Sequence, residues 1–148
     1  MPITQLEPPA AHEFLRDNSN SIYLDVRTEA EFEKGHPSDA VNVPVVFIKG
    51  PGQMEPNDEF LTVVEKAIPK DSKLVVGCMS GGRSQRACEM LEQAGYTDLV
   101  NVRGGFGGMR DASGALAVAG WRDAGLPVST ELADSSYGAM RKKAELQS

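Results

Sequence analysis

Cys78 lies where a short apolar run meets a glycine-bearing turn, within the stretch KLVVGCMSGGRSQRACEML at residues 73–91. The apolar run predicts a buried strand, and the residues after the turn predict an amphipathic helix. A thiol at this junction lies at the C-terminal edge of a parallel sheet, where open α/β folds keep their ligand crevice. Unpaired amides of the first helical turn and the helix dipole favour a negatively charged sulfur there. The pattern therefore predicts that Cys78 is a nucleophile.

The residues after Cys78 are typical of a loop that binds anions. We expect Gly81 and Gly82 to adopt backbone angles closed to other residues, so that successive amides face inward. Arg83 adds a fixed positive charge, and Ser84 either caps the helix or donates its hydroxyl into the loop. A core cysteine before an ordinary turn would not need Gly-Gly-Arg-Ser beside it. The predicted substrate-binding loop comprises Met79, Ser80, Gly81, Gly82, Arg83 and Ser84.

Four polar residues near the first predicted strand are candidates to support this site. Asp25 and Arg27 follow that strand and should emerge at the same sheet edge as Cys78. Glu31 comes four residues after Arg27, so the two side chains are close enough to pair across one helical turn. This set either fixes the loops around the site or contacts substrate directly. His36 has no cysteine or carboxylate arranged with it for a metal, so we expect a hydrogen-bonding role and no metal site.

Strand-like and helix-like segments alternate along the chain. Short β-branched runs predict buried strands at residues 22–26, 41–43, 73–77 and 99–102. Helical spacing or cap signals predict helices at residues 8–17, 28–34, 58–68 and 84–94. This alternation predicts an α/β fold with a mostly parallel sheet that is covered by helices on both faces.

Two segments are less regular. Residues 104–120 are rich in glycine, which predicts an ordered loop or a small excursion that borders the active site. Residues 129–148 are polar and show no clear apolar stripe, so we expect a mobile or loosely docked C-terminal tail. The predicted single domain therefore spans residues 1–128.

Length and composition limit the class of protein. A chain of 148 residues is long enough for one domain with its own core. A net charge of −6 argues against binding to nucleic acids or anionic membranes, because their phosphate groups would repel the chain. No run approaches the roughly 20 apolar residues of a membrane span, and the first residues lack the features of a signal peptide, so we expect a cytoplasmic protein.

The chain has only two cysteines, Cys78 and Cys88. Two cysteines cannot build a disulfide framework or a Cys-rich zinc site. Cys88 lies at the flank of the apolar stripe of the helix predicted at residues 84–94. We expect it to be a small hydrophobic residue at the edge of the core.

Three motifs together resemble those of the rhodanese family of sulfurtransferases. Cys78 and Arg83 are separated by four residues, as in the six-residue active-site loop of that family. Upstream, LDVRTEAEFEKGHPSDAVNVP resembles the family signature of Asp-Val-Arg, Glu-Phe, Gly-His and Asn-hydrophobic-Pro. Downstream, WRDAGLPV resembles the closing segment. The motifs occur in family order over about residues 10–128, although Pro37, Ser38 and Asp39 depart from the usual pattern after Gly-His.

The resemblance implies a rhodanese-like fold, with a five-stranded parallel central sheet flanked by helices on both faces. It also implies that a Cys78 thiolate attacks the outer sulfur of thiosulfate or a similar donor, and that sulfite leaves. The resulting persulfide passes its sulfur to cyanide or a thiol, so ping-pong kinetics are expected. The resemblance further implies that amides of Met79 to Ser84 stabilise the persulfide and that Arg83 holds a sulfonate group. It implies no cofactor.

The acceptor implied by the resemblance is cyanide, a small thiol, or a thioredoxin-like or sulfur-carrier protein. Nothing in the sequence demands an assembly, so we expect a monomer. Two alternatives remain open: a phosphatase or arsenate reductase of the same architecture, and a non-catalytic sulfur-binding or regulatory module. The related phosphatases have one more residue in the loop, and binding modules have typically lost the loop cysteine. The shorter loop and the presence of Cys78 therefore favour the sulfurtransferase.

Overall fold

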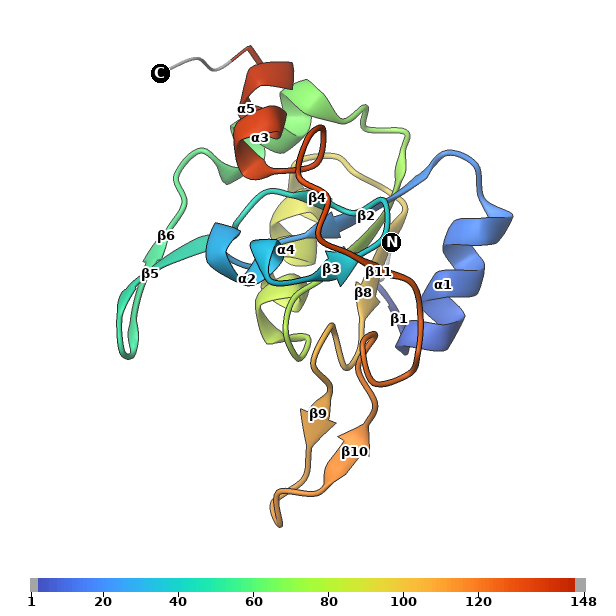
Figure 1. Cartoon of the computed structure of the whole chain (residues 1–148). Coiled ribbons are helices and arrows are strands. Elements are labelled where there is room, and N and C mark those ends of the chain that lie inside the picture. The colour runs from blue at the N-terminus through green and yellow to red at the C-terminus, as the bar shows by residue number, and fades with distance from the viewer. Residues whose placement is uncertain (1–2, 146–148) are drawn as a thin grey trace.

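The computed structural model describes residues 3–145, which fold around a five-stranded parallel sheet (Figure 1). The strand order is β1-β8-β7-β2-β4, and all neighbouring strands are parallel. Four of these strands lie within one residue of their predicted positions, whereas β1 is polar and mostly exposed and was not predicted. The strands are β1 (Thr4–Leu6), β2 (Ser21–Asp25), β4 (Val41–Asn42), β7 (Lys73–Gly77) and β8 (Leu99–Val102).

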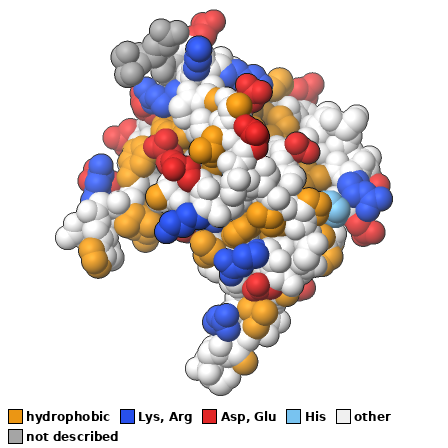
Figure 2. Space-filling model, viewed as in Figure 1, with side chains coloured by type: hydrophobic (Ala, Val, Ile, Leu, Met, Phe, Trp, Pro, Cys, Tyr) orange, Lys and Arg blue, Asp and Glu red, His pale blue; other side chains and the backbone are white. Residues whose placement is uncertain are grey.

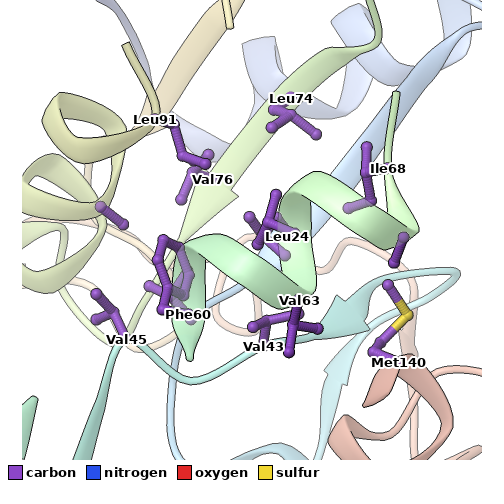
Figure 3. Close-up of a cluster of buried hydrophobic side chains, with 14 of the residues drawn as sticks. Leu24, Val43, Val45, Phe60, Val63, Ile68, Leu74, Val76, Leu91 and Met140 are labelled. Atoms are coloured by element: carbon purple, nitrogen blue, oxygen red, sulfur yellow. The ribbon is translucent and has the colours of Figure 1, made fainter. Parts of the chain in front are cut away.

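Helices cover both faces of the sheet, which confirms the predicted fold class. Successive strand residues point to opposite faces, so Leu24 joins one buried cluster while Tyr23 joins the other. Figure 3 shows the first cluster, in which the labelled side chains of the sheet and of α3 converge. The first face carries α3 (Phe60–Ala67), α4 (Gly82–Gln93) and α5 (Tyr137–Lys143), and the second carries α1 (Pro8–Asp17) and α2 (Glu29–Glu33).

Two antiparallel hairpins extend from the body of the molecule, at the left and the bottom of Figure 1, and both are visible as projections in Figure 2. One pairs β5 (Val46–Gly50) with β6 (Gln53–Pro56) and was not predicted. The other pairs β9 (Met109–Arg110) with β10 (Leu116–Val118), so the glycine-rich stretch does contain the expected small excursion. A third short pair joins β3 (His36–Pro37) to β11 (Val128–Ser129).

The C-terminal segment differs from the expectation of a mobile or loosely docked tail. Residues 137–143 form α5, which begins after Ser136 with a side-chain cap and packs beside α3. Tyr137, Met140 and Ala144 are buried in the core, at a spacing that places them on one helix face. This stripe was missed because polar residues surround its few apolar ones. Residues 146–148 of the predicted tail lie outside the described residues.

None of the helices within residues 3–145 has the length and apolar character that a membrane span requires.

Candidate active site

Cys78 directly follows β7 and lies at the base of a tight loop. The residue is almost fully buried, at 2% exposure. The backbone amide of Gly81 donates a hydrogen bond to Cys78 Sγ at 3.0 Å. Gly81 has φ +126°, a conformation that side chains rarely adopt, so glycine is needed where the loop turns back on the sulfur. The predicted inward-facing amide is therefore present at Gly81.

The helix α4 begins beside the sulfur, as the sequence predicted. Gly82, Arg83 and Ser84 are its first three residues, so their amides have no acceptor within the helix. These amides and the helix dipole favour negative charge at this end of α4. Gly82 lies outside the left-handed region, so the prediction of a special backbone conformation is wrong for Gly82 and correct for Gly81.

Ser84 directs its hydroxyl into the loop and does not cap the helix. The residue is completely buried, and its Oγ lies 3.4 Å from Cys78 Sγ and 3.1 Å from the carbonyl oxygen of Gly81. The N-cap position belongs to Gly81, which has no side chain to offer. Of the two roles weighed for Ser84, helix capping is wrong, and the hydroxyl lies inside the loop, within reach of the sulfur.

Asn101 is a site residue that the sequence analysis missed. It lies in β8 and is 4% exposed, and its Oδ1 accepts a short hydrogen bond from Ser84. Its amide Nδ2 donates to Gln5 Oε1 at 2.9 Å. A polar side chain inside an otherwise apolar buried strand was the available signal, because a buried amide needs a partner.

The glycine-rich stretch after β8 supports the loop through hydrogen bonds to its backbone carbonyls. The amides of Phe106, Gly107 and Gly104 donate to the carbonyl oxygens of Cys78, Met79 and Ser80 at 2.8, 2.8 and 3.0 Å. A Cβ atom on Gly105 would overlap the Cys78 carbonyl and lie 2.7 Å from the Met79 carbonyl oxygen. The expectation that residues 104–120 border the active site agrees with these contacts. Because the loop carbonyls are bound on this side, the loop is held in one conformation.

Arg83, in the first turn of α4, pairs with Glu31 of α2. Its Nη1 and Nη2 donate to Glu31 Oε1 and Oε2 at 2.8 and 3.0 Å. Burial by itself would raise the pKa of Glu31, but the hydrogen bonds and charge of Arg83, together with the Thr28 cap, lower it to about 2. Hydrogen bonding to Glu31 raises the pKa of Arg83. The predicted pairing of Glu31 with Arg27 is wrong.

Arg27 instead turns into the interior, where it pairs with Asp25. Both residues are 1% exposed, and Arg27 Nη2 donates to Asp25 Oδ2 and to the Gly35 carbonyl oxygen, each at 2.8 Å. The guanidinium also lies 4.4 Å from the ring centre of Phe106, in the turn that supports the loop. Asn42 donates to the carbonyls of Asp25 and Arg27. These contacts favour the loop-fixing role over direct contact with substrate.

His36 and Cys88 are both buried in structural surroundings. His36 Nδ1 donates to the carbonyl oxygen of Phe32 at 2.8 Å, and the two rings stack with centroids 3.7 Å apart. This agrees with the predicted hydrogen-bonding role. Cys88 is fully buried in the core, and burial raises its pKa to about 12. Its thiol therefore stays protonated at neutral pH.

Residues 3–145 contain no group of three or more His, Cys, Asp or Glu side chains that could hold a metal ion. The chemistry that the site offers is that of one recessed sulfur that accepts the Gly81 amide at the start of a helix, with Arg83 in the first turn of that helix.

Comparison with known proteins places this fold and loop in one family. Residues 8–112 match the rhodanese-like domain family, and this chain belongs to it. The crystal structure of Rv0390 from M. tuberculosis superposes with a TM-score of 0.74 and 34% identity, covering 88% of this chain and 100% of that one. The family match ends within the turn between β9 and β10.

Several relatives carry sulfurtransferase names. Thiosulfate sulfurtransferase 18 of Arabidopsis thaliana is 38% identical over 115 residues, or 76% of this chain and 75% of that protein. A sulfurtransferase of Allochromatium vinosum is 33% identical over 104 residues, covering 70% and 85% of the two chains. The mitochondrial protein HIGH ARSENIC CONTENT 1 of Arabidopsis thaliana is 42% identical over 90 residues, or 61% of this chain. The chain spans about half the length of that relative and of some other plant relatives.

Proposed function

We propose that this protein is a sulfurtransferase that carries a sulfane sulfur on Cys78 as a persulfide. The observation that carries the proposal is the position of Cys78 Sγ at the base of the loop. It accepts a hydrogen bond from the Gly81 amide and lies beside the first turn of α4. Amides aimed at a sulfur stabilise negative charge without reorganisation. Membership of the rhodanese-like family and the names of two relatives support the same chemistry.

The reaction has two half-reactions. The Cys78 thiolate attacks the outer sulfur of thiosulfate or a similar donor, a new S–S bond forms, and sulfite leaves with the electron pair of the broken S–S bond. Cyanide or a thiol then attacks the outer sulfur of the persulfide, and the Cys78 thiolate is released. The products are thiocyanate or an acceptor persulfide, and the kinetics are ping-pong.

Arg83 is the proposed ligand for the sulfonate of the donor. Its guanidinium is partly exposed, at 19%, and is oriented by both oxygens of Glu31. A planar guanidinium with five N–H donors can bind a carboxylate on one edge and an anionic substrate on another. The loop amides from Met79 to Ser84 provide the remaining donors.

The acting unit that we propose is the monomer, because Cys78, its supporting turn and the Glu31–Arg83 pair all come from one chain. The proposed acceptor is cyanide, a small thiol, or a thioredoxin-like or sulfur-carrier protein. We propose the cytoplasm as its compartment, where free thiols persist; both cysteines are free in the structure.

Arsenate reduction is the second candidate function, because enzymes of this class share the architecture; one relative carries the name HIGH ARSENIC CONTENT 1. The four-residue spacing between Cys78 and Arg83 is shorter than in the related phosphatases and favours sulfur over a tetrahedral oxyanion. A parallel assay with arsenate and a thiol reductant separates the two candidates.

The test is intact-protein mass spectrometry after incubation with thiosulfate and removal of small molecules. We expect the native chain and a Cys88→Ser variant to gain one sulfur, and a Cys78→Ser variant to gain none. Cyanide should remove the sulfur and form thiocyanate. If thiosulfate and other sulfane donors add no sulfur while Cys78 still reacts with iodoacetamide, the sulfurtransferase proposal is wrong.

A further inference from the structure

The buried hydroxyl of Ser84 has more acceptors within reach than it has protons. Its Oγ lies 3.4 Å from Cys78 Sγ, 3.1 Å from the Gly81 carbonyl oxygen and 2.5 Å from Asn101 Oδ1. A hydroxyl carries one proton, so Ser84 donates fully to one acceptor at a time. Whether Ser84 stabilises negative charge on the sulfur depends on which acceptor holds that proton.

Asn101 is the main competitor of Cys78 for this proton. The Gly81 carbonyl oxygen already accepts the backbone amide of Gln85 at 3.1 Å, and Asn101 Nδ2 lies 3.4 Å from it. Asn101 Oδ1 makes the shortest of the three contacts with Ser84. In the resting structure the proton is therefore directed toward Asn101, and the Ser84 oxygen presents lone pairs to the sulfur.

A chain of side-chain hydrogen bonds fixes the orientation of the Asn101 amide. Asn101 Nδ2 donates to Gln5 Oε1 at 2.9 Å, Gln5 Nε2 donates to Gln85 Oε1 at 2.6 Å, and Gln85 Nε2 donates to Glu89 Oε2 at 3.2 Å. An ionised carboxylate can only accept. The chain therefore runs in one direction, from Ser84 to Glu89, and Asn101 presents its oxygen to Ser84.

We propose that Asn101 is a positioning residue that competes with Cys78 for the Ser84 proton and so controls the fraction of anionic sulfur. When charge forms on the sulfur, the Ser84 O–H rotates from Asn101 Oδ1 to Cys78 Sγ, and no covalent bond changes. The amide chain opposes that rotation. The inference rests on the proposed role of Cys78 as the nucleophile, and it assigns to β8 and β1 a part in setting its reactivity.

The test is the pH profile of Cys78 alkylation by iodoacetamide, measured without any sulfur donor. Asn101→Leu removes the acceptor at similar volume and frees Ser84 to donate to the sulfur. We expect the profile to move down by about one pH unit, so that the rate at the acidic side rises about tenfold. Asn101→Asp should move the profile up, because a carboxylate holds the Ser84 proton more strongly and adds negative charge near the sulfur.

Two further variants separate positioning from packing. In a Ser84→Ala background, Asn101→Leu should leave the profile unchanged, because the effect acts through the Ser84 hydroxyl. Glu89→Gln, at an exposed position, should shift the profile in the same direction as Asn101→Leu and by less, because the terminal group can then also donate. Equal shifts from Asn101→Leu with and without Ser84, or no shift from Glu89→Gln in the folded protein, would overturn the proposal.

The alkylation assay is independent of the proposed sulfur transfer. A chain that accepts no sulfur from any donor still reports its thiolate fraction through iodoacetamide. If the effect of Asn101→Leu on the profile does not depend on Ser84 while sulfur loading is normal, only the proposed role of Asn101 is wrong. Failure of sulfur loading, with the expected profiles, counts against the proposed function alone.

Discussion

Two arginines at the site differ in what their guanidinium groups contact. Arg27 is buried, pairs with the buried Asp25 and binds the Gly35 carbonyl, so its donors are used within the protein. Arg83 is partly exposed and shares its charge with Glu31. A buried pair is costly to break because the remaining charge stays desolvated. Arg27 therefore serves the architecture, while Arg83 can turn one edge toward a ligand.

Glu31→Gln tests the electrostatic part of this arrangement. The pKa of Glu31 is lowered to about 2 in the folded protein, so its charge stabilises the fold above its ordinary pKa of 4.5. That contribution is lost as the pH falls toward 2. We expect the variant to be less stable than the native chain at pH 7 by about 1 kcal/mol, and the difference to shrink between pH 5 and pH 3. Urea unfolding at several pH values measures it.

Glu33→Gln, at an exposed position of the same helix, is the matched control for that series. Its difference from the native chain should stay constant over the same pH range. A Glu31→Gln difference that does not change with pH would show that the carboxylate contributes no charge interaction.

At the scale of the elements, the turn after β8 holds the active-site loop through backbone hydrogen bonds. The carbonyls of Cys78, Met79 and Ser80 are bound by amides of the turn at residues 104–107. The Gly81 amide of the same loop donates to Cys78 Sγ. Two segments that are distant in sequence thus hold one loop conformation before any substrate binds, which is the requirement for preorganised stabilisation.

Gly105→Ala should disrupt this support. The added Cβ would overlap backbone atoms of the loop, which cannot move away as a flexible side chain can. We expect a loss of about 3 kcal/mol in the free energy of unfolding and a slower reaction of Cys78 with thiosulfate. Gly114→Ala also changes a glycine with positive φ, but has open space around it, so it should cost about 1 kcal/mol and leave the reaction unchanged. Similar effects from both variants would contradict the role of the turn at residues 104–107 in supporting the loop.

At the scale of the molecule, α5 completes the core on one side of the sheet. Met140 is 2% exposed and lies among the side chains of the first buried cluster, as Figure 3 shows. The helix packs beside α3, which lies on the same face of the sheet as α4. The C-terminal segment is thus part of the fold that positions the site.

Met140→Ala should therefore destabilise the whole domain. Loss of a buried methionine side chain leaves a cavity, and we expect a cost of about 3 kcal/mol in urea unfolding. Lys142→Ala, at an exposed position of the same helix, should change the stability by less than about 0.5 kcal/mol. Equal stability of the native chain and Met140→Ala would mean that α5 is not docked in solution.

The α/β alternation, the position of Cys78 at the end of a strand and the loop with its arginine could all be predicted from the sequence, because local periodicity and turn chemistry determine them. The hydrogen-bond partners of Arg27, Glu31 and Asn101 could not be predicted from the sequence. Spacing along a helix allowed Glu31 to reach Arg27, but the register of β2 against β7 brings Arg83 into reach of Glu31 while Arg27 turns inward to Asp25. The docking of α5 likewise depends on a shared core, because its short apolar stripe is stable only when α3 covers it.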